Sequence, residues 1–415
     1  EITTRLVGSE MCIRDRYNAS LDKRAELLVY YTEKQNSDME TKKETKKNTR
    51  LLSLDTLRGF DMLFIMGFAP LVVALNALHP TAVGDVIAGH MRHVPWDGFT
   101  QHDMIFPLFL FIAGISFPFS LAKQRGSGSS DKHIYLRVFR RGVTLVLLGF
   151  LYNGFLQLNF PDVRLASVLG RIGLAWMLGA FIYMSLKKSV QYGLIVFILV
   201  GYWLLLAFVP APDAAGASPL SIEGNLVGYI DRHCLPGKLI YGNFDPEGLL
   251  STLPAIVSAL LGIYAGEIVR STRLGSGERK SLLLSGIGVV LVAIGLVWNT
   301  VFPINKMLWS SSFTCFVGGL SFLLFALFYY IVDVKGWKSW TLFFRVIGLN
   351  SITIYLAQQV VGFSHMNKFL FGGISQWVGE CAGEPAGAVV LRAGYVACCW
   401  FFLYFLYRKN IFLKV

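Results

Sequence analysis

The sequence predicts an all-α, polytopic integral membrane protein with about ten membrane-spanning helices. Two observations support this class. The 415 residues are 54% hydrophobic and only 15% charged, whereas an average soluble domain is about a quarter charged. The mean hydropathy is +0.53. Because every backbone N–H and C=O inside a bilayer must be paired within the protein, such long apolar stretches indicate helices and exclude open sheets.

Ten apolar stretches have the length that a spanning helix needs. In chain order they cover approximately residues 56–78, 103–122, 136–156, 165–186, 190–210, 249–270, 281–302, 309–332, 342–363 and 388–407. Asp61 interrupts the first of them. The amphipathic piece near 366–378 is expected to be a short helix at the membrane interface.

The charges of the connecting loops alternate along the chain, as expected when cytoplasmic loops collect Lys and Arg. One set of loops is rich in basic residues, near 42–50, 123–132, 187–188, 270–280, 335–338 and 408–414. The other set contains only Arg92, Arg164, Arg232, Lys238, Lys306 and Lys368. This alternation predicts that both termini are cytoplasmic and explains the net charge of +12. No basic patch is interleaved with aromatic residues, so we expect no nucleic-acid partner.

The N-terminal region is set apart from the membrane domain. Residues 1–50 are predicted to be a cytoplasmic tail, and 51–415 a transmembrane domain. Within the tail, LVGSEMCIRDR resembles a translated sequencing adapter, so residues 1–38 are expected to be an artefact that precedes a natural start at Met39.

Polar side chains at membrane depth are few, and each is a functional candidate because burying it in lipid is costly. The alternative is that they form structural ion pairs. The candidates are Asp55, Arg58, Asp61, Asp103, Arg171, Asp245, Glu247, Asn350, Gln358 and Gln359.

The loop from Arg92 to Thr100 is the densest polar and aromatic cluster beside a membrane entry. A neutral imidazole in it, such as that of His93, could attack a carbonyl carbon or carry a proton in acyl transfer to an amine. The commoner case is an ordinary surface histidine. No histidine or cysteine spacing matches a metal site, so no metal is expected.

Several blocks of the sequence together resemble the heparan-α-glucosaminide N-acetyltransferase family, in a bacterial, membrane-only form. The blocks are SLDTLRGFDM, HVPWDGFTQHDMIFPLFLFIAG, VLGRIGLAW, GYIDRH, YGNFDPEGLLSTLPAIVSALLGIYAG, PINKMLWSSSFT, VDVKGW, GLNSITIYLA and YRKNIFLKV. The family pattern often has an asparagine late in the first span, but this chain reads MGFAPLV there. The first span of this chain therefore lacks the asparagine of the family pattern in this stretch.

The resemblance implies that acetyl-CoA is the cytoplasmic co-substrate and that an amino sugar or glycan accepts the acetyl group outside. His93 matches the proposed active-site histidine, and Asp103 is the carboxylate that would orient it. The blocks also suggest substrate-binding residues, namely Trp96, Asp97, Asp245, Glu247, Asn305 and Asn350. Three cytoplasmic arginines suit coenzyme A phosphates, although membrane topology alone would also explain them: Arg137, Arg140 and Arg141.

The same resemblance predicts a bacterial inner membrane protein, with the His93 loop facing the periplasm and the bilayer as partner. A homodimer is compatible with it. Two other functions stay open, namely an O-acyltransferase that modifies surface polysaccharide and a sugar or glycan transporter. No internal repeat is evident, which argues mildly against the transporter.

Overall fold

Helices make up nearly all the regular structure of the computed structural model, which describes residues 51–413 except 160 and 215. Within these residues no β-strand forms, and the only strand-like contact is an isolated bridge between Arg164 and Gly237. The all-α prediction is therefore confirmed. The unit described below begins at Leu52. The predicted tail, 1–50, lies outside the described residues.

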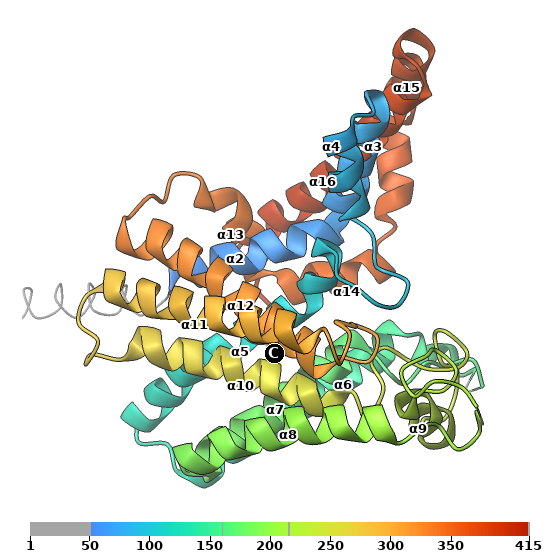
Figure 1. Cartoon of the computed structure of the whole chain (residues 1–415). Helices are drawn as coiled ribbons and strands as arrows, with labels where there is room; N and C mark the ends of the chain where they lie inside the picture. The colour runs from blue at the N-terminus through green and yellow to red at the C-terminus, as the bar shows by residue number, and fades with distance from the viewer. Residues whose placement is uncertain (1–50, 160, 215, 414–415) are drawn as a thin grey trace, which may run out of the picture. The chain divides into compact units, whose positions relative to one another are not determined.

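The helices follow one another with short connections, except for two longer segments near 79–100 and 209–251 that contain one short helix each. Figure 1 labels the helices, whose bounds are α2 Leu52–Leu63, η1 Phe64–Phe68, α3 Ala69–Leu78, α4 Ala82–Gly89, α5 Gln101–Gly126, α6 Asp131–Tyr152, η2 Phe155–Gln157, α7 Val168–Ser185, α8 Lys188–Phe208, α9 Leu226–Cys234, α10 Thr252–Arg270, α11 Gly277–Trp298, α12 Ser311–Phe328, η3 Tyr329–Val334, α13 Thr341–Leu349, α14 Ser351–Val360, α15 Phe363–Ala382 and α16 Glu384–Arg408.

Eight helical segments in the described part of the chain are long and apolar enough to cross a membrane. They are Leu52–Leu78, Gln101–Gly126, Val168–Ser185, Lys188–Phe208, Thr252–Arg270, Gly277–Trp298, Ser311–Val334 and Glu384–Arg408. The chain is thus a polytopic membrane protein. Two predicted spans are not among the eight: α6, which carries three arginines in its first half, and 342–363. The total of ten spans stays a prediction.

Two predicted spans are broken. In the first, Gly67 has φ +120°, and a Cβ there would lie 2.9 Å from the ring of Tyr395 on α16. This conformation favours glycine, so the chain changes direction between α2 and α3. In the ninth, Asn350 leaves helical geometry with φ −124° and separates α13 from α14. The prediction of one continuous helix over 342–363 was wrong, because Asn350 interrupts it.

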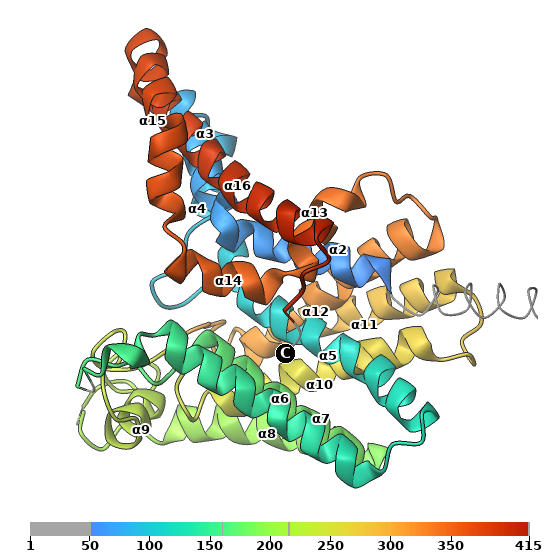
Figure 2. The same cartoon turned by 180° about the vertical axis from the view of Figure 1, so that it is seen from behind.

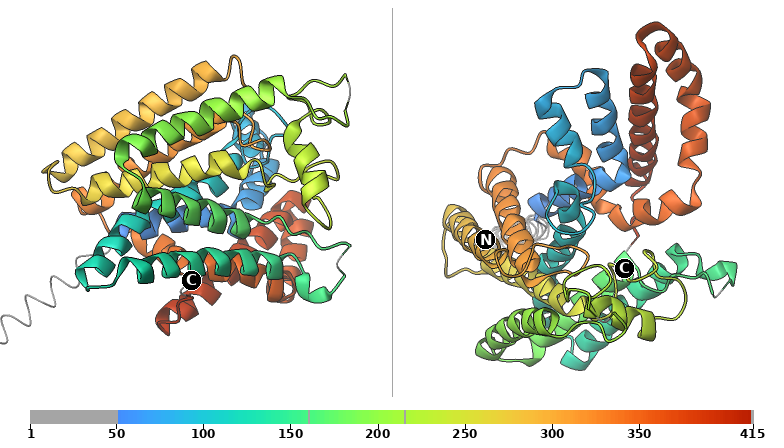
Figure 3. Two further views of the ribbon diagram at one scale, coloured as in Figure 1. Left: turned by 90° about the horizontal axis from the view of Figure 1, so that it is seen from below. Right: turned by 45° about the vertical axis from the view of Figure 1, so that its right-hand side comes forward.

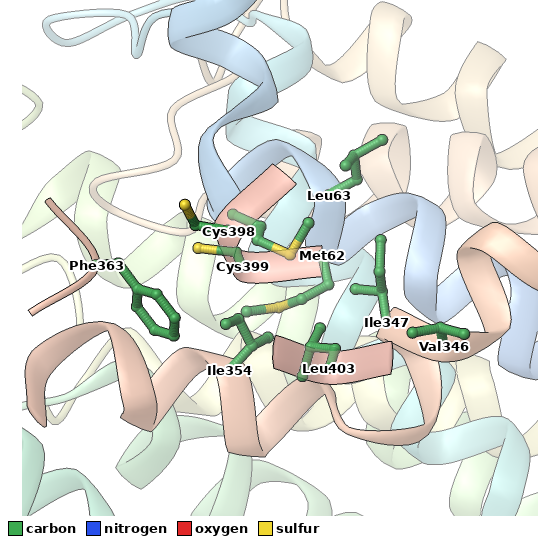
Figure 4. Close-up of a cluster of buried hydrophobic side chains, with 10 residues drawn as sticks. Met62, Leu63, Val346, Ile347, Ile354, Phe363, Cys398, Cys399 and Leu403 are labelled. Atoms are coloured by element: carbon green, nitrogen blue, oxygen red, sulfur yellow. The ribbon is translucent and has the colours of Figure 1, made fainter. Parts of the chain in front are cut away.

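A buried apolar cluster holds both breaks in place. Figure 4 shows side chains from α2, α13, α14 and α16 gathered in this cluster. The buried members are Met62, Leu63, Met66, Val346, Ile347, Ile354, Phe363, Cys398, Cys399 and Leu403. The short helices around each break are therefore fixed by packing, although none of them is long enough to be stable alone.

The segment near 366–378 is longer than expected. It belongs to α15, a helix of 20 residues. The helix turns at Gly383, where φ is +94°, and packs back along α16 as a hairpin (Figures 1 and 2). Glycine backbones allow close approach near the turn, because a Cβ on Gly387 would lie 2.5 Å from the Ser375 carbonyl. The short interfacial helix expected near 366–378 is therefore part of α15, which packs against α16.

Helices α5 and α10 pack with their backbones in contact. A Cβ added to Gly262 would lie 2.1 Å from the Phe111 carbonyl oxygen, and one on Gly266 2.3 Å from that of Ile115. In the reverse direction, a Cβ on Gly114 would lie 2.4 Å from the Ala259 carbonyl oxygen. The sequence GIYAG on α10 is thus a small-xxx-small motif of the kind that brings membrane helices together. Figure 3 shows the same helices from two further directions.

We expect Gly262→Ala to lower the midpoint of thermal unfolding in detergent. The added methyl group meets backbone, which cannot rotate away, and overpacking of this kind typically costs about 1–3 kcal/mol. The matched control is Gly286→Ala on α11, where a Cβ meets nothing within 4 Å. Alanine there should be neutral or slightly stabilising, because alanine favours helix more than glycine does. Equal midpoints for the two variants would contradict the close packing of α5 and α10.

Candidate active site

Asp103 lies in the first turn of α5 and is held by the residues that cap this helix. Its Oδ2 accepts from the Thr100 backbone N–H at 3.1 Å and from the Thr100 hydroxyl at 2.9 Å. The backbone N–H of Val94 donates to the same oxygen at 3.4 Å. A carboxylate is favourable at a helix N-terminus, where it caps free N–H groups and meets the positive end of the helix dipole. The Asp103 side chain is only 1% exposed.

The second oxygen of Asp103 binds His93, from the loop that precedes the helix. The Nδ1 of His93 lies 2.7 Å from Oδ1 of Asp103. Because a carboxylate only accepts hydrogen bonds, Nδ1 carries a hydrogen, and in the neutral imidazole the lone pair is then on Nε2. The His93 side chain is 44% exposed, so the ring can be reached from outside the protein. The ring of His102 lies beside it, with a centroid distance of 4.4 Å.

Lys306 is the third group at this site and comes from the loop between α11 and α12. Its Nζ lies 3.4 Å from Oδ1 of Asp103, 3.0 Å from Nδ1 of His93 and 3.4 Å from Nε2 of His93. The side chain is 13% exposed. Burial lowers the pKa of Lys306, while the charges of Asp103 and Glu247 partly oppose this shift. The arrangement is an imidazole between a carboxylate and an ammonium group.

Two loops hold these groups together. Asn305 donates from Nδ2 to Asp97 at 3.0 Å, and the Gly98 N–H donates to the Ile304 carbonyl at 2.8 Å. Trp96 donates from its indole N–H to the Leu220 carbonyl at 2.9 Å and packs edge-on against Phe244. Three residues that the sequence suggested for substrate binding, Trp96, Asp97 and Asn305, thus lie in the loops that carry His93 and Lys306. Their side chains bind other parts of the protein.

Arg164 forms a buried ionic cluster with Asp245 and Glu247. It donates to Asp245 from Nε and from Nη2, each at 2.6 Å, and Nη2 also donates to Glu247. The Asp245 side chain is fully buried. Burial alone would raise the pKa of Asp245, but the Arg164 guanidinium lowers it below its ordinary value. Asp245 and Glu247, expected as substrate ligands, therefore have a structural partner.

Asp231 on α9 also binds the segment that carries Asp245 and Glu247. Its two carboxylate oxygens accept from the backbone N–H groups of Leu249 at 3.0 Å and Asp245 at 3.3 Å. Burial raises the pKa of Asp231 to about 6, although these two hydrogen bonds act in the opposite direction. The segment that leads into α10 is thus fixed by ionic and hydrogen-bonding contacts.

Arg171 on α7 is 2% exposed and lies against the ring of Trp309, with the guanidinium carbon 5.0 Å from the ring centroid. Its Nη2 donates to the Gly248 carbonyl at 3.2 Å and to the Ser251 hydroxyl. Its Nε and Nη1 have no hydrogen-bond partner within the described residues. The charge of Arg171 acts on Lys306 and contributes to the lowering of its pKa.

Other predicted site residues do not contact His93. Asn350 donates to the Ile411 carbonyl at 3.1 Å and accepts from the Thr353 hydroxyl at 3.2 Å. The arginines suggested for coenzyme A lie in the first half of α6, which begins just after α5 ends. Since α5 extends for about 39 Å at 1.5 Å per residue, they lie near the end of α5 opposite to Asp103. Arg141 stacks on Trp176 at 4.4 Å, and the three are Arg137, Arg140 and Arg141.

Lys306 and Arg164 are the functional candidates that sequence reasoning missed. In the sequence, each is one basic residue in a loop. A signal for them was present, because they are among the few cations on the side that the charge rule leaves nearly free of them. Three of these six cations, Arg164, Arg232 and Lys306, form ion pairs with carboxylates. In the described part of the chain, no group of three His, Cys, Asp or Glu side chains could hold a metal ion.

Comparisons with known proteins agree with one another. A family model described as "Heparan-alpha-glucosaminide N-acetyltransferase, catalytic" matches residues 50–295. The chain is 28% identical over 424 residues to heparan-alpha-glucosaminide N-acetyltransferase of Homo sapiens, covering 88% of this chain and 60% of the relative. It is 28% identical over 433 residues to the protein of that name from Mus musculus, covering 90% and 62%. The chain thus spans about three fifths of the length of these relatives.

Proposed function

Because the chain belongs to the heparan-alpha-glucosaminide N-acetyltransferase family, we propose that it is a membrane-embedded N-acetyltransferase. It takes the acetyl group of acetyl-CoA and transfers it to the amine of a glucosamine-type sugar. One observation supports this most directly: the His93 imidazole is oriented through Nδ1 by the buried Asp103 carboxylate, and its side chain is 44% exposed. The human and mouse relatives are named for the same reaction.

The geometry suits two routes of transfer. In the first, Nε2 attacks the acetyl carbon, the C–S bond breaks, and coenzyme A leaves as a thiolate that takes up a proton. The sugar amine then attacks the acetyl-imidazole, an amide bond forms, the amine loses a proton, and His93 is released. In the second, the amine attacks the acetyl carbon of acetyl-CoA directly while Nε2 accepts the amine proton, the C–S bond breaks, and coenzyme A leaves as a thiolate that takes up a proton. In both, Asp103 stabilises the positive charge that develops on the imidazole.

The donor enters from the cytoplasmic side and the acceptor from the outer side in this proposal. The loop charges support this sidedness, because the basic loops favour the cytoplasmic face and the His93 loop is on the other side. The bacterial cytoplasmic membrane is part of the proposal and is suggested by the resemblance to the membrane-only form of the family. The three arginines of α6 suit the phosphates of coenzyme A on the opposite face. A reaction across the bilayer needs the thioester to reach inward between the helices, toward the start of α5.

The proposal is tested with radiolabelled acetyl-CoA and the purified protein in detergent. We expect labelled product with glucosamine and none with N-acetylglucosamine, because the second sugar has no free amine. The product should resist hydroxylamine, as an amide does. Equal labelling of both sugars, lost on hydroxylamine treatment, would instead show O-acylation. Absence of labelling together with sugar uptake into proteoliposomes would show a transporter.

Sidedness needs a separate measurement in sealed vesicles. Inverted membrane vesicles expose the cytoplasmic face to added acetyl-CoA, and glucosamine is loaded inside. We expect labelled N-acetylglucosamine in the lumen of inverted vesicles. Right-side-out vesicles given external acetyl-CoA should form little. Product in right-side-out vesicles alone would reverse the proposed orientation.

A further inference from the structure

We propose that Lys306 is a positioning residue that keeps His93 in its neutral imidazole form, by supplying the positive charge that buried Asp103 requires. The inference deepens the proposed function and rests on it for its catalytic meaning.

The loop that carries Lys306 is held on both sides of the lysine. Asn305 accepts the Leu308 N–H at 2.9 Å, and the Tyr202 hydroxyl donates to the Leu308 carbonyl at 2.6 Å. The Ser310 hydroxyl accepts the Asn305 N–H at 3.0 Å and donates to the Pro303 carbonyl at 2.8 Å. The neighbours of Lys306 are almost fully buried, namely Ile304, Asn305, Met307, Leu308 and Trp309.

A loop lysine would ordinarily extend into water, because its ammonium group is strongly hydrated and its side chain flexible. Lys306 instead remains 13% exposed, with Nζ against His93 and Asp103. Its position is therefore set by the fold of the loop and by the carboxylate.

The charges of the three groups can balance in only one way if His93 is to react. A buried carboxylate is costly unless a cation lies beside it. With Lys306 protonated at 3.4 Å from Asp103, this pair is neutral without any charge on the imidazole. Protonating His93 would then place two cations 3.0 Å apart. Without Lys306, the balanced state is an imidazolium bound to Asp103, which has no lone pair on Nε2.

The other groups around the site do not change this balance. His102 on α5 lies beside His93, and its ring is tilted by 57°. The charges of Glu247, from the segment before α10, and of Arg171 on α7 act on Lys306 with opposite signs. Glu247 binds Arg164, which therefore has its own carboxylate partner. Within the described residues, Lys306 is the cation next to Asp103.

The test measures the protonation of His93 directly. Diethylpyrocarbonate reacts with neutral imidazole, and mass spectrometry of the His93 peptide gives its rate of modification at each pH. The exposed fraction of His93, 44%, allows the reagent to reach the ring. The variants are Lys306→Met and Lys306→Gln, which are neutral, and Lys306→Arg, which keeps the charge. Lys368→Met is the control, because it removes an exposed cation from α15.

In the neutral variants, we expect the pH at half-maximal modification of His93 to rise by about one unit or more, as for removal of a charge within a few ångströms. Lys306→Arg and Lys368→Met should stay near the wild-type value. The acid limb of the pH profile of kcat/KM should move in the same direction. Unchanged midpoints in two folded neutral variants would overturn the inference.

The two proposals can fail separately. A shifted midpoint of modification in a protein that transfers no acetyl group would leave the role of Lys306 intact and remove the proposed function. Active wild-type protein with no shift in either neutral variant would do the reverse. The Lys306→Gln side chain can still donate a hydrogen bond to Asp103, so at least one neutral variant should retain the fold.

Discussion

Replacing His93 by alanine is expected to lower the rate of acetyl transfer by about 10³-fold, within the range of 10²–10⁴ for a general base. The truncation removes Nε2, which both proposed routes use. It should have little effect on the unfolding midpoint, because the ring is 44% exposed and Asp103 keeps Lys306 as its partner. The measurement is initial rate of glucosamine acetylation at saturating acetyl-CoA, beside thermal unfolding of the same sample.

The matched control is His79→Ala. His79 ends α3, is exposed, and belongs to the same predicted outer segment. Its removal should leave the rate within a factor of about two, as for a surface substitution. If His93→Ala kept a tenth or more of wild-type activity in a folded sample, both routes through Nε2 would be excluded. Acetyl bound to the His93 peptide after rapid quenching would select the covalent route.

The largest loss of stability is expected from Arg164→Met. Removing one partner of a buried ion pair typically costs about 3–5 kcal/mol, because the remaining charge is left without compensation. Here Asp245, with no exposed side-chain surface, and the nearly buried Glu247 would both lose their cation. The measurement is the free energy of unfolding by denaturant titration in mixed micelles.

Arg232→Met is the comparison for the same substitution at an exposed pair. Arg232 binds Asp213, and the two side chains are 23% and 37% exposed. Exposed pairs contribute about 0–1 kcal/mol. A loss at Arg164 no larger than the loss at Arg232 would show that the Arg164 cluster is dispensable for stability.

Acid should weaken the Arg164 cluster in a defined direction. The pKa of Asp245 is held below its ordinary value by Arg164, and aspartate in an unfolded chain titrates near about 3.9. The contribution of Asp245 is therefore complete above that pH and falls as the pH drops toward the lower folded value. Asp231, whose pKa is raised to about 6 by burial, has the opposite effect on stability. Its neutral form is favoured in the folded protein, so its contribution is complete below the unfolded pKa and is lost as the pH rises through the folded pKa.

The helical class could be predicted from composition, because the bilayer permits so few structures. The two breaks could not. The first span bends at Gly67, where the ring of Tyr395, far away in the sequence, packs closely. The stretch 342–363 has the hydropathy of a single helix, and Asn350, at the break, donates to the Ile411 carbonyl near the C-terminus. Both breaks lie at tertiary contacts that local sequence does not reveal.

The candidate site, too, could be predicted from the sequence only in part. His93 and Asp103 are ten residues apart, and the capping pattern at Thr100 brings them together. Lys306 lies 213 residues from His93, and its loop charge alone did not distinguish it from a lysine that faces water. The arginines of α6 match the charge rule, but that rule cannot separate a nucleotide site from ordinary topology. Their role in binding coenzyme A therefore stays a prediction.

The backbone contact between α5 and α10 has an evolutionary consequence. Asp103 begins one of these helices, and the segment with Asp245 and Glu247 leads into the other. Their spacing is set by main-chain atoms at Gly114, Gly262 and Gly266 and does not depend on the size of the surrounding side chains. Substitutions around these glycines that leave the glycines in place are therefore expected to preserve the separation of the two helix ends.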